Sequence, residues 1–288
     1  MPSTYAHYIF GQKIYRNLTG NLKNIVGEHP QLYNIGLHGP DIFFYYKPLR
    51  NNPVNSLGFQ MHNQPASDFF AKAAYILRDL RSDHALRNAG LAYILGFICH
   101  FALDSTCHGY IENKIRKTGI THTEIEAEFD RYLMIRDHLN PSTHHLADHI
   151  HPTRKNAQVI QSFFGQFSQH QIRKALSSMV WYSDLLAAPG AFKRQILYMV
   201  LKLSGNPLEI CHRIMTREAR PECQDSCLRL EKLMGKASVC CLSLIDSYID
   251  FLYDDIPLDK YFVRTFGPEM NWQSIPVYSY QEELNYEI

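Results

Sequence analysis

The sequence predicts an all-α protein, a multi-helix bundle, on three observations. Apolar residues recur at helical spacing over most of the 288 residues. No segment shows the regular alternation of apolar and polar residues that is typical of a half-buried strand. No internal repeat and no long linker divides the chain, so we expect a single domain over residues 1–288.

The first expected helix covers residues 4–18, where apolar side chains follow a helical pattern. Prolines and glycines over residues 30–40 predict a loop. A short aromatic run follows at residues 41–46, and residues 48–53 form a second break. Residues 68–79 place their apolar side chains on one face, which predicts the next helix.

A long and largely buried helix is expected over residues 88–117, with a break near Gly109. The next expected helix covers residues 120–139. Thr121 and Glu124 stand three residues apart at its start, as in a capping box. These two helices follow each other directly and are therefore expected to be neighbours in the bundle.

Helical patterns also dominate the C-terminal half of the chain. Residues 140–152 are polar, rich in His and bounded by prolines, which predicts an exposed connection. Further helices are expected over residues 157–186, 192–203 and 223–253. The tail from residue 257 is aromatic and irregular.

Charge and apolar patterning exclude several classes of function. Lys and Arg number 29 against 28 Asp and Glu, so no excess of positive charge indicates stable nucleic-acid binding. The most apolar stretch, residues 91–103, is shorter than the roughly 20 residues that cross a bilayer, so no transmembrane segment is expected. Residues 1–20 lack an apolar run, and the odd number of cysteines, seven, favours reduced thiols, so we expect a cytoplasmic protein.

Histidine is distributed unevenly along the chain. There are 15 His residues, and 13 of them precede residue 152. We therefore expect residues 1–140 to form the half that bears a metal site, and residues 152–288 to form a helical C-terminal half or extension.

His100, Asp104 and His108 lie at steps of four residues in the most apolar helix. Each step of four turns the helix by only about 40° beyond a full turn, so the three side chains line one face. A carboxylate among apolar side chains is costly unless it is paired or bound to a metal. The pattern indicates a buried metal site or a buried polar pair between helices.

His122 and Glu126 repeat the four-residue spacing on the next expected helix. Two antiparallel helices can aim such pairs into one bundle core. With 15 His and 28 acidic residues, chance predicts about 1.5 pairs of this kind, and the chain has four. Spacing alone therefore leaves metal ligands and polar helix faces as alternatives, and the apolar setting of His100 and Asp104 favours a metal.

Three earlier residues complete a longer pattern: His7 at a helix start, and Asp41 and His62 in expected loops. The order of these residues with the His and acidic pairs resembles the zinc-dependent phospholipase C family, whose all-α fold is shared with S1/P1-type nucleases. The resemblance covers about residues 1–135. It implies about two to three zinc ions, held by His7, Asp41, His62, His100, Asp104, His108, His122 and Glu126.

Carried over residue by residue, the resemblance divides these ligands among the ions. It implies that Asp41, His62 and His100 bind one zinc, which Asp104 bridges to a second zinc bound by His7. The remaining set binds the other ion and comprises His108, His122 and Glu126. Secreted relatives also use an N-terminal Trp as a ligand, and this chain has none near its start.

The same resemblance implies an activity. A zinc-activated water would attack a phosphoester, with Asp41 as its candidate base or orienter. Phe59 matches an aromatic wall of the family's substrate site, and Tyr45 is a second, weaker candidate for substrate contact. The expected substrate is a phospholipid or another phosphoester, with peripheral membrane contact. A nuclease or phosphomonoesterase on the same fold, and a non-catalytic metal-binding relative, are the alternatives.

Overall fold

Helices make up the regular structure of the protein. A computed structural model describes residues 4–187, 190, 193, 195, 214–215, 218–254 and 256–288. Within these residues every regular element is an α- or 3₁₀-helix and no strand occurs, which confirms the predicted fold class. The domain boundaries expected from the sequence stay predictions.

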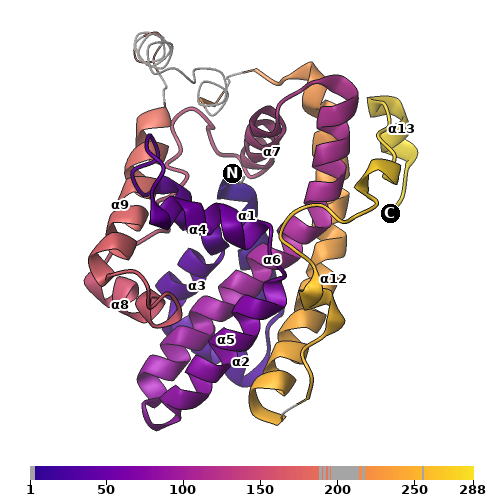
Figure 1. The fold of residues 1–288 in the computed structure, drawn as a ribbon. Coiled ribbons are helices and arrows are strands. Elements are labelled where there is room, and N and C mark those ends of the chain that lie inside the picture. The colour runs from indigo at the N-terminus through magenta and orange to yellow at the C-terminus, as the bar shows by residue number, and fades with distance from the viewer. Residues whose placement is uncertain are drawn as a thin grey trace.

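The long helix α6 (His84–Thr118) forms the axis around which the other elements pack (Figure 1). The Asp83 side chain caps its first turn, and Gly119 ends it in the left-handed conformation with φ 74°. The break expected near Gly109 was wrong, because α6 continues through this residue. A Cβ atom there would lie 2.7 Å from the Ile275 side chain, so the glycine serves a close approach by the C-terminal residues.

The N-terminal elements surround the middle of α6. The loop expected over residues 30–40 is partly helical, because Pro30 occupies the first helical turn, where its missing N–H costs nothing. His62, expected in a loop, is the last residue of a helix. The elements are α1 (Thr4–Asn17), α2 (Gly20–Glu28), α3 (Pro30–Gly36), the 3₁₀-helix η1 (Gly39–Tyr45), α4 (Pro53–His62), α5 (Ala66–Asp79) and η2 (Leu80–Ser82).

The helix that follows α6 begins as the sequence predicts. In α7 (His122–Arg136) the Thr121 side chain accepts from the Glu124 N–H, and the Glu124 carboxylate accepts from the Thr121 N–H. The connection at residues 140–152 is not exposed throughout, since Ala147, His149 and Ile150 are buried.

The segment expected as one helix over residues 157–186 is two helices, α8 (Arg154–Phe163) and α9 (Gln169–Leu186). Ser168 caps α9 with a capping box, which sets the start of a new helix after the turn. The helix expected over residues 192–203 lies outside the described residues, apart from residues 193 and 195.

The remaining elements pack on the opposite side of α6 from α8 and α9 (Figure 1). The long helix α12 runs beside α6, and buried groups join the two. Lys114 contacts Asp225 at 2.5 Å, and the Tyr110 hydroxyl donates to the Ser226 hydroxyl at 3.2 Å. The elements are η3 (Pro221–Cys223), α12 (Gln224–Asp254), η4 (Lys260–Val263), η5 (Trp272–Ser274) and α13 (Tyr280–Asn285).

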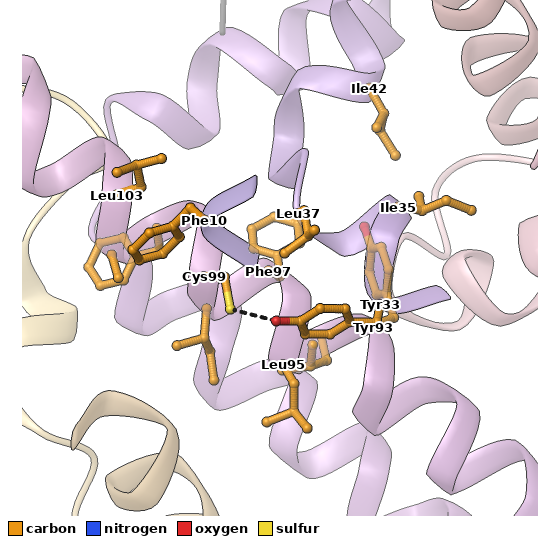
Figure 2. Packing of buried hydrophobic residues seen from close by; sticks show 14 of the residues in the cluster. Phe10, Tyr33, Ile35, Leu37, Ile42, Tyr93, Leu95, Phe97, Cys99 and Leu103 are labelled. Carbon is orange, nitrogen blue, oxygen red and sulfur yellow. Dashed lines mark hydrogen bonds between the residues drawn. The ribbon is translucent and has the colours of Figure 1, made fainter. Parts of the chain in front are cut away.

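A chain of buried hydrogen bonds joins four helices in the core. The Tyr33 hydroxyl of α3 donates to the Gly11 carbonyl of α1 at 2.7 Å, and it lies 3.4 Å from the Cys99 sulfur of α6 (Figure 2). The Cys241 thiol of α12 donates to Cys99 at 3.7 Å. The Tyr33 hydroxyl and the two thiols therefore have partners within the apolar interior, which avoids the cost of leaving them unsatisfied.

Among the described residues, α6 alone has the length and composition of a membrane-crossing helix. However, 83% of its most apolar window is buried inside the protein. This burial is what a central core helix requires, so the apolar composition of α6 is accounted for by packing.

Helices α3 and α6 cross at two glycines. A Cβ atom on Gly36 would lie 2.1 Å from the Tyr93 carbonyl oxygen, and one on Gly96 would lie 2.2 Å from the Tyr33 carbonyl oxygen. Because these neighbours are backbone atoms, they cannot move aside without shifting a helix. The two backbones therefore approach as closely as they do only because both residues lack a side chain.

We predict that Gly96→Ala lowers the free energy of unfolding by about 1–3 kcal/mol, the usual cost of overpacking a core. Denaturant unfolding monitored by circular dichroism measures this change. Gly235→Ala is the matched control, because Gly235 lies inside α12 with nothing within 4 Å of a new Cβ. It should stabilise the helix by roughly 0.5–1 kcal/mol. Equal effects of the two substitutions would contradict the close crossing.

Candidate metal centre

Two groups of His and acidic side chains meet beside the middle of α6. In each group, one nitrogen or oxygen atom per residue lies within 4.8 Å of the same kind of atom on every other member. The first group comprises Asp41, His62, His100 and Asp104, and the second comprises His108, His122 and Glu126. These are the sets that the sequence predicts for separate metal ions, although their binding of metal stays a prediction.

The first group is assembled from three elements. His100 and Asp104 lie one turn apart on α6, with His100 Nε2 3.2 Å from an Asp104 oxygen. Asp41 comes from η1, where its carboxylate lies 3.6 Å from His100 Nε2 and 3.1 Å from His62 Nε2. The end of α4 supplies His62. The asparagine cap Asn52 and Pro53 set where α4 begins, and His62 is the last residue of this helix.

His7 is placed beside the first group by the way α1 begins. The Asp130 carboxylate accepts from the Tyr5 and Ala6 N–H groups at 3.1 and 2.8 Å, which anchors the first turn of α1. His7 follows directly, is 3% exposed, and lies 3.0 Å from Asp104 through Nε2. Asp104 is therefore shared by His7 and His100, as expected of a bridging carboxylate.

The second group lies between α6 and α7. His122 Nε2 is 2.9 Å from a Glu126 oxygen one turn further along α7, and the His108 and His122 rings are 5.3 Å apart. Glu112 lies 3.5 Å from the other nitrogen of His122. Sequence reasoning did not assign Glu112 a place in the site. The spacing of four residues along α6 could have indicated it, because Glu112 follows His100, Asp104 and His108 at the same spacing.

Three of the histidines have the nitrogen that faces away from the centre engaged by a main-chain carbonyl. A carbonyl can only accept, so Nδ1 carries the proton in each ring and Nε2 is left free to bind a metal. Every residue has a main-chain carbonyl, so the sequence could not show which carbonyls contact these rings. The pairs are His62 with Gly58 at 2.7 Å, His100 with Leu37 at 3.3 Å and His108 with Phe266 at 2.6 Å.

The buried polar atoms at the centre fit a metal. Both Asp41 oxygens, His100 Nε2 and His122 Nε2 are buried and make no hydrogen bond of good geometry, although their charged partners lie 2.9–3.6 Å away. Unsatisfied buried groups of this kind are rare and costly. A cation among these oxygen and nitrogen atoms would satisfy them together, and mixed His and carboxylate sets suit Zn²⁺.

Without metal, the centre relies on charge coupling between acids and histidines. Burial by itself raises the pKa of Asp104, but His100, His108 and His7 outweigh it and hold that pKa well below its ordinary value. Burial opposes charge on His122, yet Glu126 and Glu112 outweigh it and raise the pKa of this ring to about 9. Asp104 is therefore ionised and His122 protonated at neutral pH in the metal-free chain.

The two groups open on one cleft of about 350 Å³. Its lining includes Phe59, which is 59% exposed at the rim, and no Lys or Arg borders it among the residues that the structure describes. Tyr45 is 8% exposed and borders a separate cavity of about 60 Å³ beside Glu126. Contact of Phe59 or Tyr45 with substrate stays a prediction, which the cleft lining supports for Phe59 alone.

His145 and His149 do not join the centre. His145 is exposed and hydrogen-bonds Asp184 at 2.6 Å. His149 is buried, and its Nε2 lies 2.7 Å from Nε2 of the buried His38. No local pattern could indicate this pair, because the two residues are 111 positions apart.

Comparison with known proteins agrees with the geometry. A family model described as zinc-dependent phospholipase C matches residues 6–177, which include every residue of the two groups and His7. Neither the curated proteins nor the solved structures give a significant match.

We predict that Asp104→Asn weakens zinc binding by more than roughly 100-fold. Loss of an outer-shell partner costs roughly 10–100-fold, and Asp104 is expected to contact the metal itself, between His7 and His100. Elemental analysis and chelator competition measure the change. His145→Ala is the control and should retain all zinc. Full zinc content in Asp104→Asn would show that this carboxylate does not bind metal.

The raised pKa of His122 predicts a pH-dependent stability of the metal-free protein. Because the folded-state pKa lies above the ordinary value of 6.5, the contribution of this ring is fully present below about pH 6.5 and is lost as the pH rises through about 9. After chelation, the difference in Tm between wild type and His122→Gln should shrink across this interval. Zinc-loaded wild type should not show the same loss, because the metal replaces the proton. A constant difference in Tm would contradict the assignment.

Proposed function

Since the chain belongs to the zinc-dependent phospholipase C family, we propose that it hydrolyses the phosphodiester of a phospholipid on the head-group side, releasing diacylglycerol. The observation that carries this proposal is the convergence of two metal-capable groups on one cleft. The cleft lining combines acidic residues with aromatic ones and has no Lys or Arg. A phosphate bound there would therefore depend on metal ions for positive charge.

Each residue set has a separate part in the proposal. Asp41, His62, His100 and Asp104 would hold one ion, and His7 would add to the Asp104 side of a neighbouring ion. His108, His122 and Glu126 would hold a further ion. When zinc is bound, it supplies Lewis-acid chemistry, lowering the pKa of a water molecule and stabilising negative charge on a phosphate.

Asp41 is the residue that would orient or deprotonate the attacking water. It is 1% exposed, yet it borders the cleft. Burial raises the pKa of its carboxyl, but His100 and His62 outweigh burial and lower that pKa, so the group is anionic at neutral pH. An anionic carboxylate at the edge of the cleft can accept a proton from water.

The rim of the cleft supports contact with a lipid surface. Phe59 borders the cleft and is 59% exposed, and Met270, two residues after the cleft-lining Pro268, is 95% exposed. Peripheral membrane contact and a cytoplasmic location both remain part of the proposal. A nuclease activity is less well supported, because the cleft lining offers no Lys or Arg to contact a nucleic-acid backbone.

We expect zinc-loaded protein to release diacylglycerol and a phosphorylated head group from phospholipid vesicles. Chelation should abolish the release and added zinc should restore it. Asp41→Asn should lower kcat by at least roughly 100-fold, the contribution of a well-placed general base. Lipid extraction followed by mass spectrometry measures the product, with His145→Ala as the control variant.

Other products would replace this function with one of the alternatives. Release of nucleotides from single-stranded DNA or RNA, without diacylglycerol, would identify a nuclease. Stoichiometric zinc with no hydrolysis of lipid, nucleic acid or a soluble phosphodiester would identify a non-catalytic metal-binding relative.

A further inference from the structure

The C-terminal segment, residues 256–288, reaches the metal centre although it lies outside the part of the chain that the family model matches. Its Gly267 and Pro268 line the cleft, and its Phe266 is 1% exposed. The centre is therefore not built by the N-terminal half alone.

Phe266 contacts three of the histidines that face the centre. Its carbonyl oxygen accepts from His108 Nδ1 at 2.6 Å. Its ring centroid lies 5.7 Å from that of His62 and 5.8 Å from that of His100. One residue thus contacts both metal-capable groups.

Contacts with α6 hold the C-terminal segment along the helix turns that carry the site. The Tyr261 hydroxyl lies 3.4 Å from the hydroxyls of Ser105 and Thr106, which lie between Asp104 and His108. Further along, the buried Asn113 side chain donates to two carbonyls of the segment, at 3.2 and 2.6 Å. The absence of a side chain at Gly109 leaves the room that this close approach needs.

The segment is also anchored on both sides of Phe266. Before it, the Arg264 carbonyl accepts from the Ala66 N–H at 2.9 Å. After it, Glu283 is fully buried and pairs with Arg229 of α12 at 2.7 Å. Arg229 Nε also donates to the Glu283 carboxylate at 3.1 Å. Removing either partner would leave an uncompensated buried charge, so this ion pair holds the segment against α12.

We propose that Phe266 is a positioning residue of the metal centre: its buried ring holds His62 and His100, and fixes its own carbonyl against His108, in the orientation that binds zinc. The inference rests on the proposed zinc centre but not on the identity of the substrate. Outer-shell partners of this kind orient a metal-binding ring and select the nitrogen that carries its proton.

The experiment compares zinc affinity in variants of Phe266 and of a control residue, Phe262. Phe266→Leu keeps the core filled but removes the ring, and Phe266→Ala is the stronger change. Phe262 gives the matched control, because it is equally buried in the same segment. Its ring stacks or packs on the rings of Phe70, Phe101 and Tyr248, none of which belongs to the metal-capable groups. Chelator competition measures zinc affinity, and thermal unfolding of the metal-free proteins measures stability.

We expect both Leu variants to lose similar stability without metal, but only Phe266→Leu to lose zinc affinity, by about 10-fold, with Phe266→Ala approaching 100-fold. Wild-type zinc affinity in a folded Phe266 variant would overturn the proposal. So would an equal loss in Phe262→Leu, which would reduce the effect to stability. Wild type that binds zinc but hydrolyses no phosphoester would refute the proposed function alone, and wild type that binds no zinc would refute both.

Discussion

Asp104 places a carboxylate in the interior of the bundle, and its need for compensation shapes everything around it. The residue is 5% exposed and holds its charge at neutral pH. An isolated buried charge is far too costly for a marginally stable fold. Its neighbours are imidazoles, which compensate this charge when they are protonated, and a metal cation held among them would compensate it as well. The side chains concerned are His7, His62, His100 and His108, at 3.0–3.9 Å.

Helix packing turns this local requirement into a defined geometry. The glycine crossing of α3 and α6 brings the start of η1 against His100. Gly39 has a left-handed backbone (φ 46°), and a Cβ atom on it would lie 2.3 Å from the His100 ring. The hydrogen-bond chain from Gly11 through Tyr33 and Cys99 to α12 keeps the same helices in register. Polar side chains on α6 thus sit in a rigid apolar setting, where electrostatic interactions are stronger than in water.

The sequence predicted the helical fold and much of the candidate centre, for identifiable physical reasons. Helical periodicity identified α6, and four-residue spacing put His100, Asp104 and His108 on one face. Periodicity and spacing did not predict the features that depend on backbone conformation. The sequence predicts a loop at Pro30, which instead starts α3, and a loop at His62, which instead ends α4.

What the sequence determined by itself is the order and helical phase of the site residues, because periodicity and spacing are local properties of the chain. Only the tertiary structure decided which groups meet. Asp41 joins His100 across 59 positions and His108 finds the carbonyl of Phe266 across 158, contacts that leave no periodic trace. It also decided that His149 is buried against His38 rather than solvated. Such pairings follow from how whole helices pack, which depends on the summed shape and burial of many side chains rather than on any short pattern.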